Sequence, residues 1–359
     1  MVLKEDGVYR IEGTSESNLS ASTIDRTISI QAPNTAALFN NRVVFFSEQG
    51  VVAVNDTGAE IISRPIEKAL LALNANNNPN FHEYSFGVGY ESDRKYILSV
   101  ITSPSDTVAT QQFVYNSLTN TWTRWDRRNY CGIVSSRDDK LYFGGAFDSS
   151  AYLYQERKSL TSADHADENY DITIVTSSGL DIELSALTNV EVGDEIVQGG
   201  SQATITAINE LTTTVTVDTL ESWSAGAAIL YKPIDVEVQT VQISGNNPGT
   251  MKHIPECSLY FENADFGELT ATFTSDFIGA AYSVPITIDQ LGGWGEFAWG
   301  LTPWGGDIEG SRRIRVLVPR EIQRTNWMTI TISNSKAFTS FSLQGLSVRF
   351  NLQSERQRQ

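Results

Sequence analysis

The sequence of 359 residues predicts an all-β protein: a partial β-propeller with an inserted small β-barrel, followed by a C-terminal β-sandwich. Three observations lead to this architecture. Short runs of β-branched and aromatic residues alternate with clusters of Gly, Asn, Asp and Ser, which is typical of all-β domains. A hairpin pattern repeats near the N-terminus at the spacing of a propeller blade. The charge composition changes abruptly twice along the chain, which indicates separate modules.

Residues 1–160 are expected to form propeller-like blades. Leu3–Ile11 and Phe46–Val54 share an apolar strand, an acidic turn with Gly and a second apolar strand, at an offset of 43 residues. A blade takes about 40–45 residues, so about four blades are expected, the lower limit of a propeller. A β-sandwich built of hairpins is the alternative. Ile66–Leu73 is the one helical pattern. Two looser hairpins are expected: Lys95–Ile101 with Gln112–Tyr115, and Lys140–Phe143 with Tyr152–Tyr154.

Residues 161–232 are expected to form an inserted acidic small β-barrel. From Thr161 to Tyr231 there are 12 acidic residues and no Lys or Arg, so these residues hold −12 of the formal net charge of −17. Ala151–Gln155 before it and Ile234–Ile243 after it are both expected to be propeller strands, which makes the barrel an insertion at a loop tip. Its expected strands are Val190–Val197, Ala203–Ile208, Thr213–Val217 and Ala225–Leu230.

Residues 233–359 are expected to hold the final propeller strand or strands and the β-sandwich. A Trp-Gly loop, Gly292–Gly306, carries Trp294, Trp299 and Trp304. Such aromatic residues contact partners at interfaces, stack on ligands or fold back onto their own domain, and all three interpretations stay open. The expected sandwich strands are Cys257–Glu262, Leu269–Ser275, Tyr282–Ile288, Arg313–Val318, Met328–Ser333 and Phe341–Asn351.

The end of the chain is basic. From Ser311 to Gln359 there are nine basic residues against two acidic ones. Arginines on a strand are commonly a solvated face or form ion pairs at an interface, and phosphate contact is the other interpretation. The aromatic interleaving of a base-reading surface is absent, so contact with another subunit or a partner is favoured. The candidates are Arg312, Arg313, Arg315, Arg320 and Arg324.

The chemical inventory for catalysis is poor. The sequence contains no nucleophile elbow, P-loop, H-E-x-x-H or C-x-x-C motif, and only two Cys and three His. Asp164–Asp171 lacks the ligand spacing of a calcium loop and is interpreted as a solvated acidic linker. A charge of −17 argues against general nucleic-acid binding. We therefore expect no enzyme activity, no catalytic, cofactor-binding or metal-binding residue, no cofactor and no membrane span.

Several motifs resemble the nozzle, or packaged-DNA stabilisation, proteins in the tails of short-tailed bacteriophages. The resemblance covers both regions that flank the barrel, and the barrel would be an insertion that some members carry. Members usually have more chain before the first turn, so this chain is expected to begin within the propeller. The motifs are Lys4–Arg10, Phe45–Val51, Ile62–Ile66, Val114–Asn116, Thr121–Trp125, Phe297–Gly300, Pro303–Gly305, Val318–Arg320, Gln323–Arg324, Trp327 and Phe341–Ser347.

The resemblance implies a structural virion protein, made in the host cytoplasm. Such a subunit joins a six-fold ring, a hexamer, below the portal and adaptor and encloses the channel through which the genome is ejected. Double-stranded DNA would pass without sequence-specific binding, and acidic walls would repel its phosphates. The alternative function is a receptor- or carbohydrate-binding tail module that uses the Trp-Gly loop or the propeller face. A cell-wall or glycan hydrolase is the third hypothesis.

Overall fold

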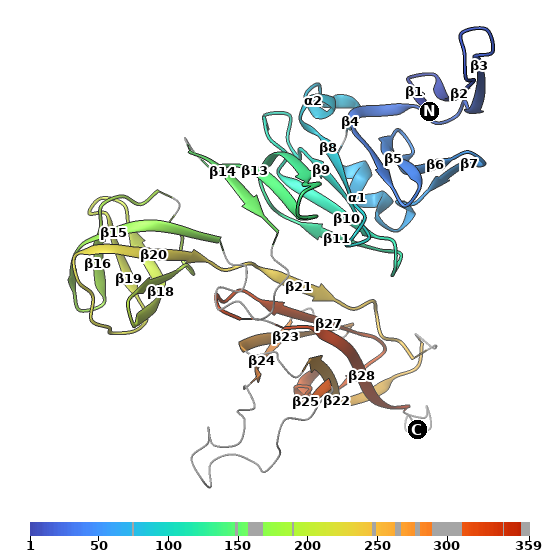
Figure 1. Ribbon diagram of the computed structural model, residues 1–359. Coiled ribbons are helices and arrows are strands. Elements are labelled where there is room, and N and C mark those ends of the chain that lie inside the picture. Colours follow the sequence, from blue (N-terminus) through green and yellow to red (C-terminus); the bar gives the residue numbers. More distant parts are fainter. Residues whose placement is uncertain are drawn as a thin grey trace. The chain divides into compact units, whose positions relative to one another are not determined.

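The computed structural model describes residues 1–73, 75–147, 150–156, 168–188, 190–245, 249–262, 267–276, 281–288, 311–339 and 341–352. Within these ranges the chain forms 28 strands and five short helices, so the all-β prediction is confirmed. The chain divides into two compact units (Figure 1), an N-terminal unit, Met1–Arg157, and a C-terminal unit, Lys158–Gln359.

The N-terminal unit consists of four antiparallel sheets in which strands adjacent in sequence are adjacent in the sheet. The first sheet is β1 (Val2–Lys4), β2 (Gly7–Glu12) and β3 (Ser20–Asp25). The second is β4 (Ile30–Phe39), β5 (Arg42–Ser47), β6 (Gly50–Asn55) and β7 (Gly58–Ile61). The third is β8 (Phe86–Tyr90), β9 (Lys95–Val100), β10 (Gln111–Asn116) and β11 (Thr121–Trp125). The fourth is β12 (Asn129–Val134), β13 (Leu141–Phe147) and β14 (Ser150–Gln155).

The repeated hairpin pattern forms the same structure twice. Lys4 pairs with Gly7 in the first sheet, and Ser47 pairs with Gly50 in the second, at the same offset along the chain. Gly50 has φ of 106°, and a Cβ there would lie 2.3 Å from the Ser63 Oγ. That hydroxyl accepts the N–H of Val51 at 2.8 Å, so the turn requires Gly for both backbone and space.

The other expected elements of this unit are also present. β9 pairs with β10, and β13 pairs with β14, in the two looser hairpins. The helical pattern forms η1 (Arg64–Ile66) and α1 (Glu67–Ala72), which are followed by η2 (Ala75–Asn77) and α2 (Phe81–Tyr84).

Three hydrophobic cores lie in series between the four sheets. Because side chains alternate across a strand, Phe45 faces the first sheet whereas Phe46 faces the third. In β9, Leu98 likewise joins the core shared with the second sheet, and Ile97 joins the core shared with the fourth. The second and third sheets are therefore covered on both faces, which explains their nearly continuous apolar sequences.

The second and third sheets meet where β4 passes closely over β8. A Cβ on Gly87 would lie 2.2 Å from the Thr35 carbonyl oxygen. Tyr96, a fully buried residue of β9, donates its hydroxyl to that same oxygen at 2.8 Å. β4 is bulged here, and the Thr35 Oγ1 accepts the N–H of Phe46 at 2.9 Å. One threonine thus joins three strands.

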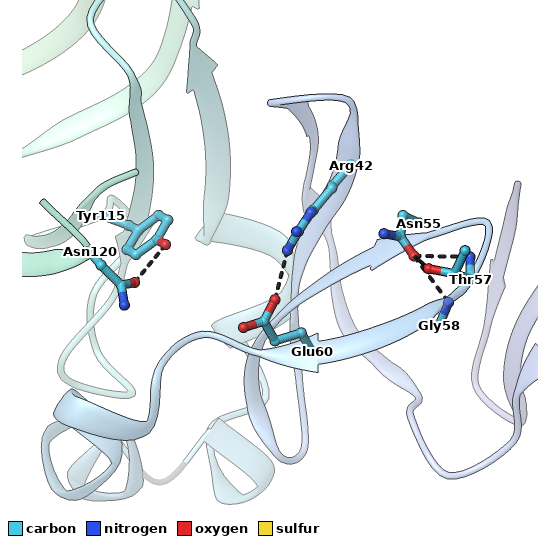
Figure 2. A network of polar contacts seen from close by, with 7 residues as sticks. All are labelled: Arg42, Asn55, Thr57, Gly58, Glu60, Tyr115 and Asn120. Atoms are coloured by element: carbon cyan, nitrogen blue, oxygen red, sulfur yellow. Dashed lines mark hydrogen bonds and ion pairs between the residues drawn. The ribbon is translucent and has the colours of Figure 1, made fainter. Parts of the chain in front are cut away.

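Polar contacts line the edge of the same pair of sheets (Figure 2). Arg42 forms an ion pair with Glu60 at 2.7 Å, and the Tyr115 hydroxyl donates to the Asn120 Oδ1 at 2.8 Å. Partial burial, and then the nearby Glu60 carboxylate, raises the pKa of Tyr115. The Trp122 Nε1 donates to the Ile62 carbonyl at 2.9 Å, which ties β11 to the chain that follows β7.

A closed barrel of six strands opens the C-terminal unit, so this prediction is confirmed. Its first two strands are not among those expected, although their sequences alternate: Ile172 and Ile174 of the first, and Ile182 and Leu184 of the second, face the core of the barrel. Asp194 is buried, which raises its pKa, and it accepts the Glu191 N–H at 2.8 Å beside Lys232 at 3.4 Å. In order around the barrel the strands are β15 (Glu168–Ser178), β16 (Asp181–Leu184), β19 (Thr214–Val217), β18 (Ser201–Asn209), β17 (Glu195–Gln198) and β20 (Gly226–Lys232).

Two further sheets complete this unit and share one hydrophobic core. One has the order β21 (Val236–Gln239), β27 (Met328–Asn334), β23 (Gly267–Ser275) and β24 (Tyr282–Ile288). The other has the order β25 (Ser311–Leu317), β22 (Lys252–Glu262) and β26 (Arg324–Thr325), and β28 (Leu343–Leu352) also pairs with β22. All six strands expected after residue 256 are present.

One expected boundary is wrong. The strand after the barrel is expected to belong to the propeller, but β21 pairs with β27 of the C-terminal unit, from Val236 opposite Asn334 to Gln239 opposite Thr331. The strand before the barrel, β14, does belong to the N-terminal unit. Along the chain the barrel therefore follows the N-terminal unit and is not an insertion within it. The sequence did not reveal this because the partner of β21 lies about ninety residues further along the chain.

We expect Tyr96→Phe to lower the free energy of unfolding of the N-terminal unit by about 1–3 kcal/mol, because it leaves the buried Thr35 carbonyl without its donor. Native-state hydrogen exchange of the β9 amides measures this. Tyr115→Phe is the matched control, since its hydroxyl bonds the exposed Asn120, and it should cost less than about 1 kcal/mol. Equal losses in the two variants would contradict the role given to Tyr96.

We expect Gly87→Ala to destabilise the same unit by about 1–3 kcal/mol, because the methyl group overlaps backbone atoms of β4 and overpacking forces the strands apart. Gly200→Ala is the control, as no atom lies within 4 Å of a Cβ there. Urea denaturation of both variants provides the comparison. If Gly87→Ala left the free energy of unfolding unchanged, β4 would not pass as closely over β8 as described.

Candidate functional site

The structure describes the predicted arginines but not the three predicted tryptophans. Trp294, Trp299 and Trp304 lie outside the described residues. Arg312, Arg313 and Arg315 belong to β25, as expected for a basic strand. Arg320 lies in η3 (Arg320–Ile322) and Arg324 in β26, and both are exposed. Of these five arginines, Arg313 and Arg315 share one face of their strand, and the site is built around them.

β22 is the central strand of this site, with β25 on one side and β28 on the other (Figure 1). Its Cys257, Leu259 and Phe261 point into the core of the unit. Alternation places Glu256, Ser258 and Tyr260 on the outer face. There Tyr260 pairs with Arg313 and Gly345, and Ser258 pairs with Arg315 and Ser347. We call this outer face, with Glu256 and Arg349 at its end, the arginine face.

Glu256 is the anchor of the arginine face. It is 7% exposed, and it forms ion pairs with Arg315 from β25 and with Arg349 from β28, the latter at 3.5 Å. The two arginine side chains remain 62% and 71% exposed. A single buried carboxylate thus positions two guanidinium groups across three strands, because a charge in that place requires partners.

Arg313 is held separately, by a hydrogen bond from its Nε to the Ser258 Oγ at 3.0 Å. The Tyr260 hydroxyl lies 3.4 Å from the Ser347 Oγ in the next row. Each guanidinium has five N–H donors in a planar fork, and these contacts use only some of them. The arginine face is therefore suited to bind carboxylates or phosphates of a partner with paired hydrogen bonds.

Sequence reasoning missed Glu256 and Arg349. A single acidic residue within an apolar strand, between Pro255 and Cys257, is the signal that indicates a buried ion pair. Nothing in the sequence indicates that Arg349 lies opposite Glu256, because the two residues belong to paired strands that are more than ninety residues apart in the sequence.

Two neighbouring hollows lie beside α1 in the N-terminal unit, of about 190 and 250 Å³. Gln49, Ser63 and Glu67 line both of them. Glu48 lies in the first and Arg64 in the second, and Phe46, Leu70 and Leu71 give the first hollow an apolar side as well. Their chemistry suits a small polar ligand, but their shared residues also build the Gly50 turn, which explains their presence.

The two cysteines of the chain lie in different surroundings. Cys131 is exposed, whereas Cys257 is buried, and burial raises the pKa of its thiol to about 11. Within the described ranges, no group of three or more His, Cys, Asp and Glu side chains is placed to hold a metal ion. No helix in this part of the chain is long and apolar enough to cross a membrane.

No protein-family model matches this chain, and a search of curated proteins finds no match to it. The arguments for function therefore rest on the residues and the fold themselves.

We expect Arg315→Ala with Arg349→Ala to lower the stability of the C-terminal unit by about 1–3 kcal/mol at neutral pH, because Glu256 is left buried without a partner. Adding Glu256→Gln to the double variant should restore most of the loss. Thermal unfolding by calorimetry measures both effects.

Lys336→Ala is the control for this pair of measurements. Its partner Glu268 is 57% exposed, and exposed pairs contribute about 0–1 kcal/mol. If the added Glu256→Gln change gave no recovery, Glu256 would not be the anchor of the arginine face.

Proposed function

We propose that this chain is a structural subunit of the tail of a short-tailed bacteriophage. In this proposal it forms a ring-shaped nozzle, six-fold by the resemblance, that encloses the DNA exit channel below the portal and adaptor. It acts by assembly and carries out no catalysis. The observation that supports it most is the series of meander sheets in the N-terminal unit, which agrees with the propeller implied by the tail-protein motifs.

The propeller is itself part of the proposal. In a propeller, consecutive four-stranded meanders pack face to face around an axis. Here β8 contacts both β4 and β12, so the first strands of three consecutive sheets lie next to one another. Core residues such as Val8, Phe46 and Phe143 fill the three spaces between sheets. These contacts support an arc of four blades.

The C-terminal unit supplies the contacts to other proteins in this proposal. Its two sheets beyond the barrel share one core, which supports a β-sandwich, and the arginine face lies on one of these sheets. Arg313, Arg315 and Arg349 would bind acidic groups of a neighbouring subunit, the portal or the adaptor. The acidic barrel would repel DNA phosphates if it borders the channel.

Sedimentation of the purified chain and electron microscopy of the virion test this function. We expect closed rings on the tail axis, with the arginine face at a protein contact. A chain that stays monomeric at all concentrations and is absent from the tail axis would contradict the proposal. Specific binding in a glycan screen, lost in Trp299→Ala, would instead support the receptor-binding alternative, and cleavage of cell-wall polymers in a zymogram would support the hydrolase.

A further inference from the structure

The series of sheets in the N-terminal unit has two ends. The second and third sheets are covered on both faces, but the first and fourth sheets contribute to only one core each. Among the described residues, no hydrophobic cluster joins β12–β14 to β1–β3. Each end sheet therefore has one face that no other sheet of this unit covers.

The uncovered face of the fourth sheet is apolar. Antiparallel pairing places Cys131, Gly144 and Leu153 in one row, and it places Ile133, Tyr142 and Gln155 in the next. We call these six residues the fourth-sheet end face. Ile133 is 65% exposed and Leu153 is 72% exposed. Leu141 and Phe143, whose side chains alternate with these, are fully buried against the third sheet.

An antiparallel sheet with one solvated face normally alternates apolar and polar residues. The fourth sheet departs from that rule, because an isoleucine, a leucine, a cysteine and a tyrosine stand where polar residues are expected. Its composition resembles that of β5 and β6, which are covered on both faces. Contiguous apolar surface of this kind marks an interaction site.

The outer face of the first sheet is similar. Leu3 and Val8 point toward the second sheet, so alternation places their neighbours on the opposite side. Val2 pairs there with Tyr9, and Ile11 pairs with Ala21. We call Val2, Tyr9, Ile11, Ala21 and Thr23 the first-sheet end face. Ile11 is 52% exposed.

We propose that the fourth-sheet end face of one copy binds the first-sheet end face of the next copy. The argument is continuity with the interfaces inside the chain: such a face is covered three times in this unit, each time by the next meander sheet. The two end faces terminate the same series, so joining them extends it by the same kind of contact. The contact is head to tail, and repeated head-to-tail contacts close into a ring or continue as a filament.

This inference rests on the proposed function and names the surfaces that hold the ring together. It requires no contribution from the arginine face, which leaves that face for other partners. It also assigns the exposed Cys131 a place inside the contact, where its thiol would be shielded from solvent.

Variants of the chain that each have one end face blocked test the contact. Ile133→Asp blocks the fourth-sheet end face, with Leu153→Asp as a second variant of that face, and Ile11→Asp blocks the other. Because each buries a carboxylate without a partner, we expect association to weaken by at least about tenfold in each. Leu118→Asp is the control, since Leu118 is 69% exposed in the turn after β10 and belongs to neither face.

Mixing the blocked variants makes the test specific. Ile133→Asp retains an intact first-sheet end face, and Ile11→Asp retains an intact fourth-sheet end face. Sedimentation of the equimolar mixture should therefore show a dimer with one chain of each kind and nothing larger. Circular dichroism confirms that both variants are folded. Two-fold dimers within either variant alone would contradict a head-to-tail contact.

Alkylation of Cys131 gives a second measurement. We expect it to be slow in the wild-type assembly and at least about tenfold faster in Ile11→Asp, whose own Cys131 environment is unchanged. Buried Cys257 is the internal reference. Slow alkylation of Cys131 in both the wild type and Ile11→Asp would mean that another part of the same chain covers the fourth-sheet end face. That result would overturn the inference.

The outcomes separate the two proposals. Rings that persist in both blocked variants would overturn the end-face contact but leave the ring function standing. A wild-type chain that never assembles would overturn the ring function and this contact together.

Discussion

The N-terminal unit depends on one constraint, the close passage of β4 over β8. Gly87 allows the Thr35 carbonyl to approach, and the buried hydroxyl of Tyr96 satisfies that carbonyl. Without the glycine the strands separate, and without the hydroxyl a polar group is buried at a cost. Because both central sheets are covered on both faces, their spacing fixes the positions of the sheets on either side.

Electrostatics has a different role in each part of the chain. The net charge of −17 belongs mostly to the barrel segment, whereas the C-terminal unit orders its cations around Glu256. A buried carboxylate does little for stability compared with an apolar residue of the same shape. Its contribution is to hold Arg315 and Arg349 in fixed positions, which is what recognition of a partner requires.

The sequence predicted much of the fold, but less of the site. Strand patterns are local, so the hairpins, the helix after Pro65 and the barrel strands from Glu195 onward follow from alternation and turn residues. The pairing of β21 with β27 does not, because it joins segments far apart in sequence. The same limit hid Arg349 from sequence reasoning, although the basic strand with Arg313 and Arg315 was identified from composition alone.

The sequence by itself determined that this is an all-β protein of distinct modules, with an acidic barrel and a basic end. Composition and alternation carry that information because each depends only on neighbouring residues. Only the tertiary structure decided which faces are covered. Ile97 and Ile133 have the same side chain, yet one is fully buried between two sheets and the other is exposed on an end face. That difference comes from long-range packing, which no local pattern encodes.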